Sequence, residues 1–224
     1  MNTNFYFRHG GVIHNFQLGS SNNSKIGFGM LLQTYHISEA QLTDHTKDKK
    51  NCLGCVFSHS KGGGCYTHKG HSLMGVKSKI RSINRIGLEN IQEFNLDTLK
   101  LIKNFYNFAK SQTSLIRMGA YGESVTMPNE VVSLLSKFKN RTAYTQRWRG
   151  SNFQGDYMAS VSTLNLKTIA NERGYKTFRV LGKNDIIQAD EIVCPASKEA
   201  KKSKTCITCK LCNGSKMNIA IYQH

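Results

Sequence analysis

The clearest indication of the fold is the stretch YMASVSTLNLKTIANERGYKTFRVL, residues 157–181. Residues 157–163 are a short apolar run of the kind that forms a strand, and residues 165–173 follow the spacing of a helix that Gly174 can end. Residues 175–181 then favour a second strand. Strands joined by a helical crossover lie parallel, so this stretch predicts a β-α-β unit.

The same alternation of strand and helix patterns extends from this unit in both directions. Asn95 can cap a helix, and Pro128 is well placed to begin another, because its missing N–H would have no partner there. No element is assigned to residues 1–24. The predicted strands cover residues 26–35, 114–120, 141–145, 191–194 and 217–222, and the predicted helices cover residues 72–90, 96–112 and 128–138.

These elements predict a single α/β domain over residues 1–224, because a chain of this length with 39% hydrophobic content can bury one core. Parallel strands are covered by helices on both faces, so the expected sheet is mostly parallel. Both an open sheet and a reduced or complete (β/α) barrel of the TIM type fit. We expect a Cys-rich loop at residues 52–71 and a metal-binding insertion at residues 194–215, which makes a C-terminal Cys-rich lobe.

The charge of the chain predicts a polyanionic partner. The sequence has 31 lysine and arginine residues against 14 aspartate and glutamate residues, which gives a formal net charge of +17. Such a field attracts nucleic acid and speeds its encounter with the protein. The alternatives are a basic protein that gains only solubility from its charge and one that touches an anionic membrane surface. Charge alone does not separate DNA from RNA.

No secretory or membrane-spanning segment is predicted. Residues 1–10 contain no apolar core of a signal peptide, and no run of about 18 apolar residues occurs. We therefore expect a cytoplasmic protein, in the host cytoplasm if a phage encodes it, without a membrane partner. The seven cysteines are then expected to bind metal or to react, because thiols stay reduced there and disulfides cannot exhaust an odd number.

Four cysteines toward the C-terminus form the strongest motif. Cys194, which precedes a proline, is followed by Cys206-x2-Cys209-x2-Cys212 and later by His224. Four thiolates can close a tetrahedral zinc site, with the histidine as a replacement ligand. A Cys-x2-Cys-x2-Cys run with a remote Cys-Pro also fits an iron–sulfur cluster, and isolated buried cysteines are the least favoured reading. A zinc site closed by four thiolates would be structural.

A second group of cysteines has the spacing Cys52-x2-Cys55-x9-Cys65. It has enough ligands for another metal site but no standard zinc-finger spacing. The alternative is a glycine-rich loop at residues 62–64, whose backbone N–H groups approach a phosphate while the cysteines are incidental. Three histidines lie nearby in the sequence: His59, His68 and His71.

Two basic segments are candidates for contact with nucleic acid. Trp148 lies between Arg147 and Arg149 at a predicted strand end, a combination that can stack on a base and hold phosphates. An equally good interpretation is a tryptophan at the edge of the core with arginines in solvent. A lysine-rich stretch beside the metal motif is either a phosphate contact or a solvated face. Its lysines are Lys198, Lys201, Lys202 and Lys204.

Three carboxylates are candidate catalytic groups. Residues beyond the carboxyl ends of parallel strands line the site in α/β folds, and Glu123 and Asp185 occupy such positions, while Asp156 precedes a strand. In a cationic cleft a carboxylate stays charged and suits the role of nucleophile or base, for which Glu123 is preferred. Motifs of phosphate-binding loops, dinucleotide-binding folds and hydrolase nucleophile elbows do not occur.

Four parts of the chain carry a resemblance to known sequences: residues 55–70, residues 116–123, Tyr144-Thr145, and Cys194-Pro195-Ala196-Ser197 with the later three cysteines. Together they resemble the "gene product eighty-eight" family of bacteriophage and actinobacterial genomes, over most of the chain. Two positions depart from the family pattern: Gly62 stands where the family has a further cysteine, and Glu123 where it has an aspartate. The first departure weakens the case for a metal site in the N-terminal loop.

The order of strands, clustered cysteines and a later histidine is in turn similar to tRNA-guanine transglycosylases and their phage DNA relatives. This resemblance implies a glycosyltransferase that modifies DNA, in which a carboxylate attacks the sugar C1′, guanine leaves, and a 7-deazaguanine base takes its place. The implied partners are DNA rather than RNA and a purine or deazapurine base. The alternatives are a non-catalytic, zinc-stabilised DNA- or RNA-binding phage protein and an iron–sulfur enzyme.

Overall fold

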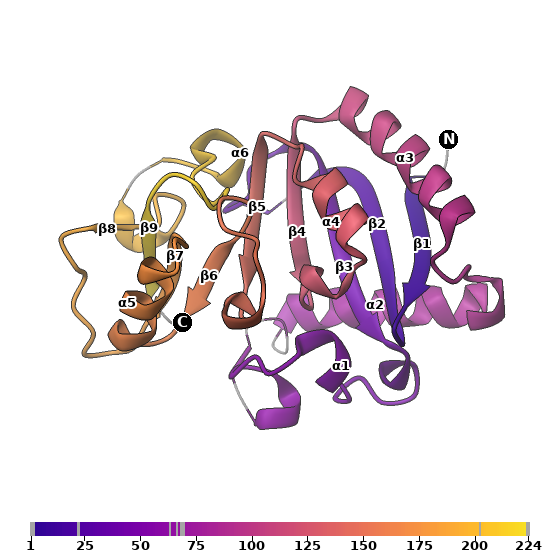
Figure 1. Cartoon of the computed structure of the whole chain (residues 1–224), viewed down its shortest axis with the longest axis horizontal. Coiled ribbons are helices and arrows are strands. Elements are labelled where there is room, and N and C mark those ends of the chain that lie inside the picture. Colours follow the sequence, from indigo (N-terminus) through magenta and orange to yellow (C-terminus); the bar gives the residue numbers. More distant parts are fainter. Residues whose placement is uncertain are drawn as a thin grey trace. The chain divides into compact units, whose positions relative to one another are not determined.

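The structure, a computed structural model, describes residues 3–21, 23–62, 64–65, 67, 70–201 and 203–222, apart from the side chains of residues 70 and 71. Within this range nine strands form one sheet in the order β1-β2-β3-β4-β5-β6-β7-β9-β8, and six α-helices are present (Figure 1). The strands are β1 (Asn4–His9), β2 (Val12–Ser21), β3 (Gly29–Ser38), β4 (Leu115–Tyr121), β5 (Asn140–Thr145), β6 (Met158–Val161), β7 (Thr177–Leu181), β8 (Glu191–Val193) and β9 (Asn218–Tyr222). The helices are α1 (Lys49–Cys52), α2 (Gly70–Ile86), α3 (Leu96–Gln112), α4 (Asn129–Leu135), α5 (Leu164–Glu172) and α6 (Cys206–Cys209).

The sheet confirms the predicted α/β class with mostly parallel pairing. Strands β4 to β7 pair in parallel in chain order, and β9 pairs in parallel with both β7 and β8. The predicted barrel is wrong. The strand order starts at β1 and ends at β8, and no pairing between these two edges is found in the described part of the chain. The sheet is therefore open.

The chain divides into two compact units. Strands β2, β3 and β4 contribute residues to both of them. Unit 1 consists of Met1–Leu18, Gln33–Ser111 and Gly119–Leu135. Unit 2 consists of Gly19–Leu32, Gln112–Met118 and Ser136–His224.

Unit 1 contains a hairpin in the region to which the sequence assigns no element. Strands β1 and β2 pair antiparallel, with His9 opposite Val12. Gly10 and Gly11 form the turn, with φ angles of 60° and 74°. Positive φ at both central residues is the requirement of a two-residue type I′ turn, and glycine meets it without steric cost.

Helices cover both faces of the hairpin in unit 1. Ile13 of β2 packs in the same core cluster as Val76 of α2. The ring of Phe16, also on β2, lies 6.4 Å from the ring of Phe105 on α3. Side chains alternate between the two faces along a strand, so residues 13 and 16 point to opposite faces. Therefore α2 and α3 pack on opposite sides of this part of the sheet.

Unit 2 contains the parallel strands around the quoted β-α-β stretch. Ala159 of β6 packs with Ala170 of α5, which runs along β6 and β7 (Figure 1). Met158 points to the opposite face, where Cys194 and Cys212 pack in the same core cluster. The cysteine-bearing segment is therefore part of the core of unit 2, and a separate C-terminal lobe is not confirmed.

The helix starts follow from local chemistry. The side-chain oxygen of Asn95 accepts hydrogen bonds from the N–H groups of Asp97 at 3.0 Å and Thr98 at 2.9 Å, which confirms it as the cap of α3. The carbonyl of Pro128 accepts the N–H groups of Val131 and Val132 at 3.0 Å each at the start of α4. None of the described helices is long and apolar enough to cross a membrane.

Candidate metal-binding cysteine sites

All four C-terminal cysteines line a single cavity of about 40 Å³ in unit 2. The sequence-predicted ligands Cys194, Cys206, Cys209 and Cys212 are thus brought together, although they come from three different segments of the chain. The fifth predicted ligand, His224, lies outside the described residues.

Backbone hydrogen bonds fix the segments that carry these cysteines. Cys194 directly follows β8, and its N–H donates to the carbonyl of Ala220 on β9 at 2.8 Å. The helix α6 is a single turn with a cysteine at each end, and the N–H of Cys206 donates to the carbonyl of Lys25 at 3.0 Å. The carbonyl of Cys212 accepts the N–H of Ala143 on β5 at 3.0 Å. Each segment is therefore tied to the framework of unit 2.

The thiols lie close enough to interact electrostatically. Burial raises the pKa of Cys212 to about 12, with further contributions from Cys194, Cys206 and Cys209, while a hydrogen bond with Tyr144 acts in the opposite direction. Burial also raises the pKa values of Cys206 and Cys209. Without a cation these thiols stay protonated at neutral pH, and a bound metal would replace their protons.

Positive side chains surround the thiols. The positive charges of Arg117 and Lys25 act to lower the pKa of Cys206, which opposes the effect of burial. Lys204 and Lys216 act to lower the pKa of Cys209. The backbone N–H of Leu211 also acts to lower the pKa of Cys209. Hydrogen bonds and cations of this kind stabilise thiolates, and sequence reasoning missed Arg117, Lys25 and Tyr144 because they are far away in the chain.

The four cysteines are ligands of the type that a thiophilic metal prefers, but their side chains are not positioned to hold one. In the described part of the chain, no group of three or more histidine, cysteine or acidic side chains stands in position to hold a metal ion. The four sulfurs therefore share a cavity without forming a closed coordination sphere, and binding requires side-chain rotation. A single zinc ion and an iron–sulfur cluster both use such a cysteine set, and the volume of about 40 Å³ changes when the side chains rotate.

The N-terminal cysteines also come together, in unit 1. Cys52 ends α1, and Leu53 and Gly54 follow with positive φ angles of 33° and 89°. This reversal brings the N–H of Cys55 to the carbonyl of Cys52 at 2.8 Å. Cys65 returns to the same loop, with its N–H bonded to the carbonyl of Phe57 at 3.0 Å.

Glu123, the preferred catalytic carboxylate, lies beside these cysteines. It is 8% exposed, and its N–H donates to the carbonyl of Asn51 at 2.7 Å, one residue before Cys52. Burial raises the pKa of Cys52, and the charges of Asp48, Cys55, Glu123 and Cys65 add to this effect. Sequence spacing gives no indication of this proximity. Of the nearby histidines, His68 and the side chain of His71 are outside the described residues, as is Gly63 of the glycine loop.

The other two candidate carboxylates take part in structural contacts of unit 2. Asp156 accepts a hydrogen bond at 3.0 Å from Arg141, which also donates to four backbone carbonyls. Asp185 accepts the N–H of Gly182 at 2.7 Å and lies 3.9 Å from Arg179. Both side chains therefore stabilise loops of unit 2.

Trp148 is a core residue. It is 1% exposed and packs with Ala159 and Tyr175, and the guanidinium of Arg149 lies 4.5 Å from its ring centroid. Its burial removes the surface that a base would need, so base stacking by Trp148 is not supported. Arg147 and Arg149 remain exposed.

The predicted lysine-rich stretch lies at the surface beside the C-terminal cysteines. Lys198, Lys201 and Lys204 are exposed, and Lys202 is outside the described residues. Lys216, which sequence reasoning missed, is also exposed and acts on the same cysteine as Lys204. These lysines are therefore free to meet solvent anions near the thiol cavity.

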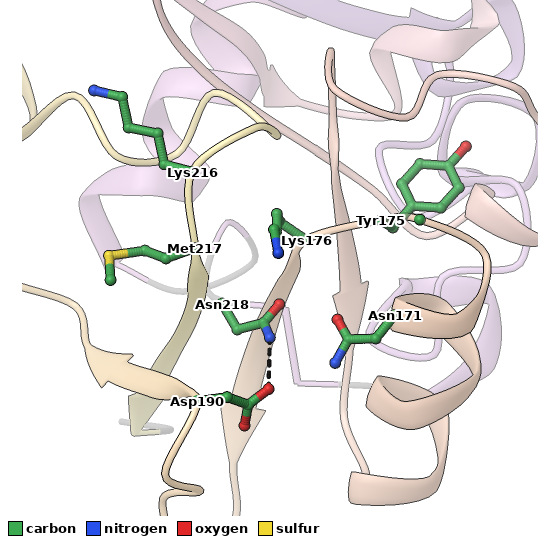
Figure 2. Close-up of a pocket in the computed structure, with 8 residues that line it drawn as sticks. Asn171, Tyr175, Lys176, Asp190, Lys216, Met217 and Asn218 are labelled. Atoms are coloured by element: carbon green, nitrogen blue, oxygen red, sulfur yellow. Dashed lines mark hydrogen bonds between the residues drawn. The ribbon is translucent and has the colours of Figure 1, made fainter.

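A further polar cavity of about 380 Å³ opens in unit 2 at the amino-terminal ends of β7 and β9 (Figure 2). Figure 2 shows Asn171, Lys176 and Asn218 around it. Asp190 accepts hydrogen bonds from Lys167 at 2.7 Å and Asn218 at 2.8 Å, which give it a structural role. Parallel sheets bind ligands at the opposite, carboxyl ends of their strands, so this cavity has no ligand-binding precedent in the fold.

Comparison of the chain with family models, curated proteins and solved structures finds no match. The functional conclusion therefore rests on the geometry of the two cysteine groups and the charges around them.

Proposed function

We propose that this chain is a zinc-stabilised protein that binds nucleic acid. The observation that carries the proposal is the single cavity of unit 2 that all four C-terminal cysteines line. Thiolates are the preferred ligands of structural zinc, and four of them complete its coordination without an open position. The role of the metal is then to hold the segments of Cys194, Cys206–Cys209 and Cys212 together.

The charges around the cavity support nucleic acid as the partner. A zinc ion with four thiolates carries a net charge of about −2, which nearby cations offset. Arg117 and Lys25 are placed for this role, since they act on Cys206. Lys204 and Lys216 are exposed as well as close to Cys209, so they can also contact phosphates. The formal net charge of +17 acts in the same direction.

Nucleic-acid binding is tested by reversing the charge beside the cavity. Lys204→Glu with Lys216→Glu is compared with Lys103→Glu and Lys137→Glu, two exposed lysines that do not line the thiol cavity and give the same change in net charge. Fluorescence anisotropy with DNA and RNA duplexes over a range of salt is the assay. The proposal expects the first pair alone to lower the salt slope by about 1 per lost phosphate contact. Equal effects of the two pairs would contradict it.

Base exchange by a DNA guanine transglycosylase is the second candidate function, and its support is the buried position of Glu123. Asp156 and Asp185 contribute less, because both stabilise loops. The test is incubation of the protein with DNA and labelled guanine or a labelled 7-deazaguanine base. Incorporation by the wild type and its loss in Glu123→Gln would support exchange, and absence of label in wild-type reactions rejects it.

A further inference from the structure

We propose that Cys52, Cys55, Cys65 and Glu123 form a second metal site, in which three thiolates and one carboxylate hold a thiophilic divalent ion. As in the four-cysteine cavity, the described side chains are not already in position to hold an ion, so binding requires them to rotate. This site lies in unit 1, whereas the four-cysteine cavity lies in unit 2. It assigns Glu123 to metal coordination instead of nucleophilic attack. The proposal is independent of nucleic-acid binding.

The local backbone of this group repeats that of the four-cysteine site. Both α1 and α6 are single helical turns that end at a cysteine, and each is followed by a non-glycine residue in the left-handed region. These residues, Leu53 and Lys210, are two of the three described non-glycine residues with positive φ. Such conformations cost energy and persist where the surroundings require them. Leu53 and Lys210 each reverse the chain directly after a cysteine, whereas the third such residue, Lys201, ends a short helix without one.

The hydrogen bonding of the sulfurs is repeated as well. The backbone N–H of Phe57, two residues later, acts to lower the pKa of Cys55, just as the N–H of Leu211 acts to lower the pKa of Cys209. An N–H that points at sulfur stabilises the thiolate form, which is the form that binds metal. In both units, therefore, a backbone N–H two residues after a cysteine acts on its thiol, although the cysteine spacing differs.

The path of the chain after β4 brings Glu123 to the thiols. Gly122 has a φ of 74°, and a Cβ atom there would lie 2.5 Å from the carbonyl oxygen of His36. Only glycine allows this close approach, which lets the N–H of Glu123 reach the carbonyl of Asn51 at 2.7 Å. Asn51 is itself held by a hydrogen bond to the carbonyl of His36 at 2.8 Å. The backbone of Glu123 is thereby held against Asn51, the residue before Cys52.

The charges of the group favour a cation. Glu123 and Asp48 are both buried, and both act on the thiols of Cys52 and Cys55. Asp48 accepts the N–H groups of His59 at 2.7 Å and Ser60 at 3.0 Å, so it ties down the loop between the cysteines. Two carboxylates and three thiols packed together repel one another once ionised, and a divalent ion converts this repulsion into attraction.

The mixed ligand set gives this site a different property from the four-cysteine site. Thiolates bind soft metals strongly, whereas a carboxylate is a harder and weaker ligand. Of the four ligands, the carboxylate of Glu123 is therefore the one that water or a substrate oxygen can replace. Sites with three protein ligands and one exchangeable position are typical of catalytic zinc, and four-thiolate sites are typical of structural zinc.

The test measures metal content and affinity in the full-length protein, with Zn²⁺ for stoichiometry and Co²⁺ as the spectroscopic probe. Cys55→Ser should bind about one ion per chain fewer than the wild type, whatever the occupancy of the four-cysteine site. Glu123→Gln should keep that ion at saturation but bind it about 10–100-fold more weakly in competition with a chelator. Glu130→Gln, at an exposed carboxylate of α4, is the matched control and should match the wild type.

Three results would overturn the proposal. The first is an unchanged metal content in Cys55→Ser, and the second is an unchanged affinity in Glu123→Gln. The third is the broad visible absorbance of an iron–sulfur cluster after anaerobic purification, with loss of that absorbance in Cys55→Ser. Circular dichroism of each variant confirms that it is folded. A loss of the ion from Cys209→Ser but not from Cys55→Ser would retain the four-cysteine site and reject the second one.

Discussion

Unit 1 should lose stability as the pH falls below neutrality, because it buries two histidines in their neutral form. His14 and His36 are each 0% exposed, and their Nδ1 atoms lie 2.8 Å apart. The Nε2 atom of His36 lies 2.9 Å from the hydroxyl of Thr34, which also accepts the N–H of Gly119 at 2.8 Å. Burial lowers the pKa of His36 from 6.5 to about 3, and burial together with the charge of His36 lowers that of His14.

The size of the effect follows from the difference between the folded and unfolded pKa values. Between pH 3 and pH 6.5 the unfolded state binds more protons at His36, so the free energy of unfolding falls as the pH decreases through this window. From pH 7 to pH 5 the loss from this residue alone is about 2 kcal/mol. Protonation of His14 in the unfolded state adds to the loss in the same direction.

The assay is urea unfolding at pH 7 and pH 5 with a chelator present, so that metal release does not contribute. His36→Gln should be less stable than the wild type at pH 7 but should lose about 2 kcal/mol less on going to pH 5. His45→Gln, at a partly exposed histidine, serves as the control and should keep the wild-type slope. If His36→Gln and the wild type lose the same free energy, the buried neutral pair is not the cause.

Three further substitutions test the packing described above. Trp148→Ala should lower the free energy of unfolding by about 3–5 kcal/mol because the ring is 1% exposed, and a loss below about 1 kcal/mol in urea unfolding would contradict its place in the core. Arg179→Met should lower the free energy of unfolding by about 3–5 kcal/mol, because it removes the ion-pair partner that lies 2.6 Å from buried Glu191. If the unpaired charge is the cause, adding Glu191→Met should restore the stability. Gly122→Ala should reduce both thermal stability and the metal content of unit 1, because its Cβ would meet the carbonyl of His36, and wild-type metal content in a folded variant would argue against the second site.

The parallel part of the fold is predictable because its signals are local. Asn95 is followed by a periodic apolar face, and Gly174, with a φ of 82°, comes directly after Arg173, the C-cap of α5. Each of these residues acts through its own backbone neighbours, so the sequence is sufficient. The hairpin around Gly10–Gly11 can also be predicted from the sequence, because two glycines between alternating apolar runs indicate a two-residue turn.

Long-range placement explains what the sequence could not predict. The spacing of Cys206, Cys209 and Cys212 indicates a shared site, but the approach of Cys194 and Tyr144 depends on the order of β5, β8 and β9 in the sheet. In the same way, Glu123 follows the end of β4, and its N–H bonds to the carbonyl of Asn51, the residue before Cys52, although the two segments are far apart in the sequence. The barrel was expected from helix and strand alternation alone, and that pattern does not distinguish a closed sheet from an open one.

The central claim, that the C-terminal cysteines hold a metal ion, is tested most directly by native mass spectrometry combined with elemental analysis of the wild type and Cys212→Ser. Cys212 is 7% exposed and lines the thiol cavity of unit 2, so its loss removes one of the four ligands there. The account predicts that the wild type retains zinc and that Cys212→Ser carries about one zinc ion fewer per chain. Equal zinc content in the two folded proteins would contradict it.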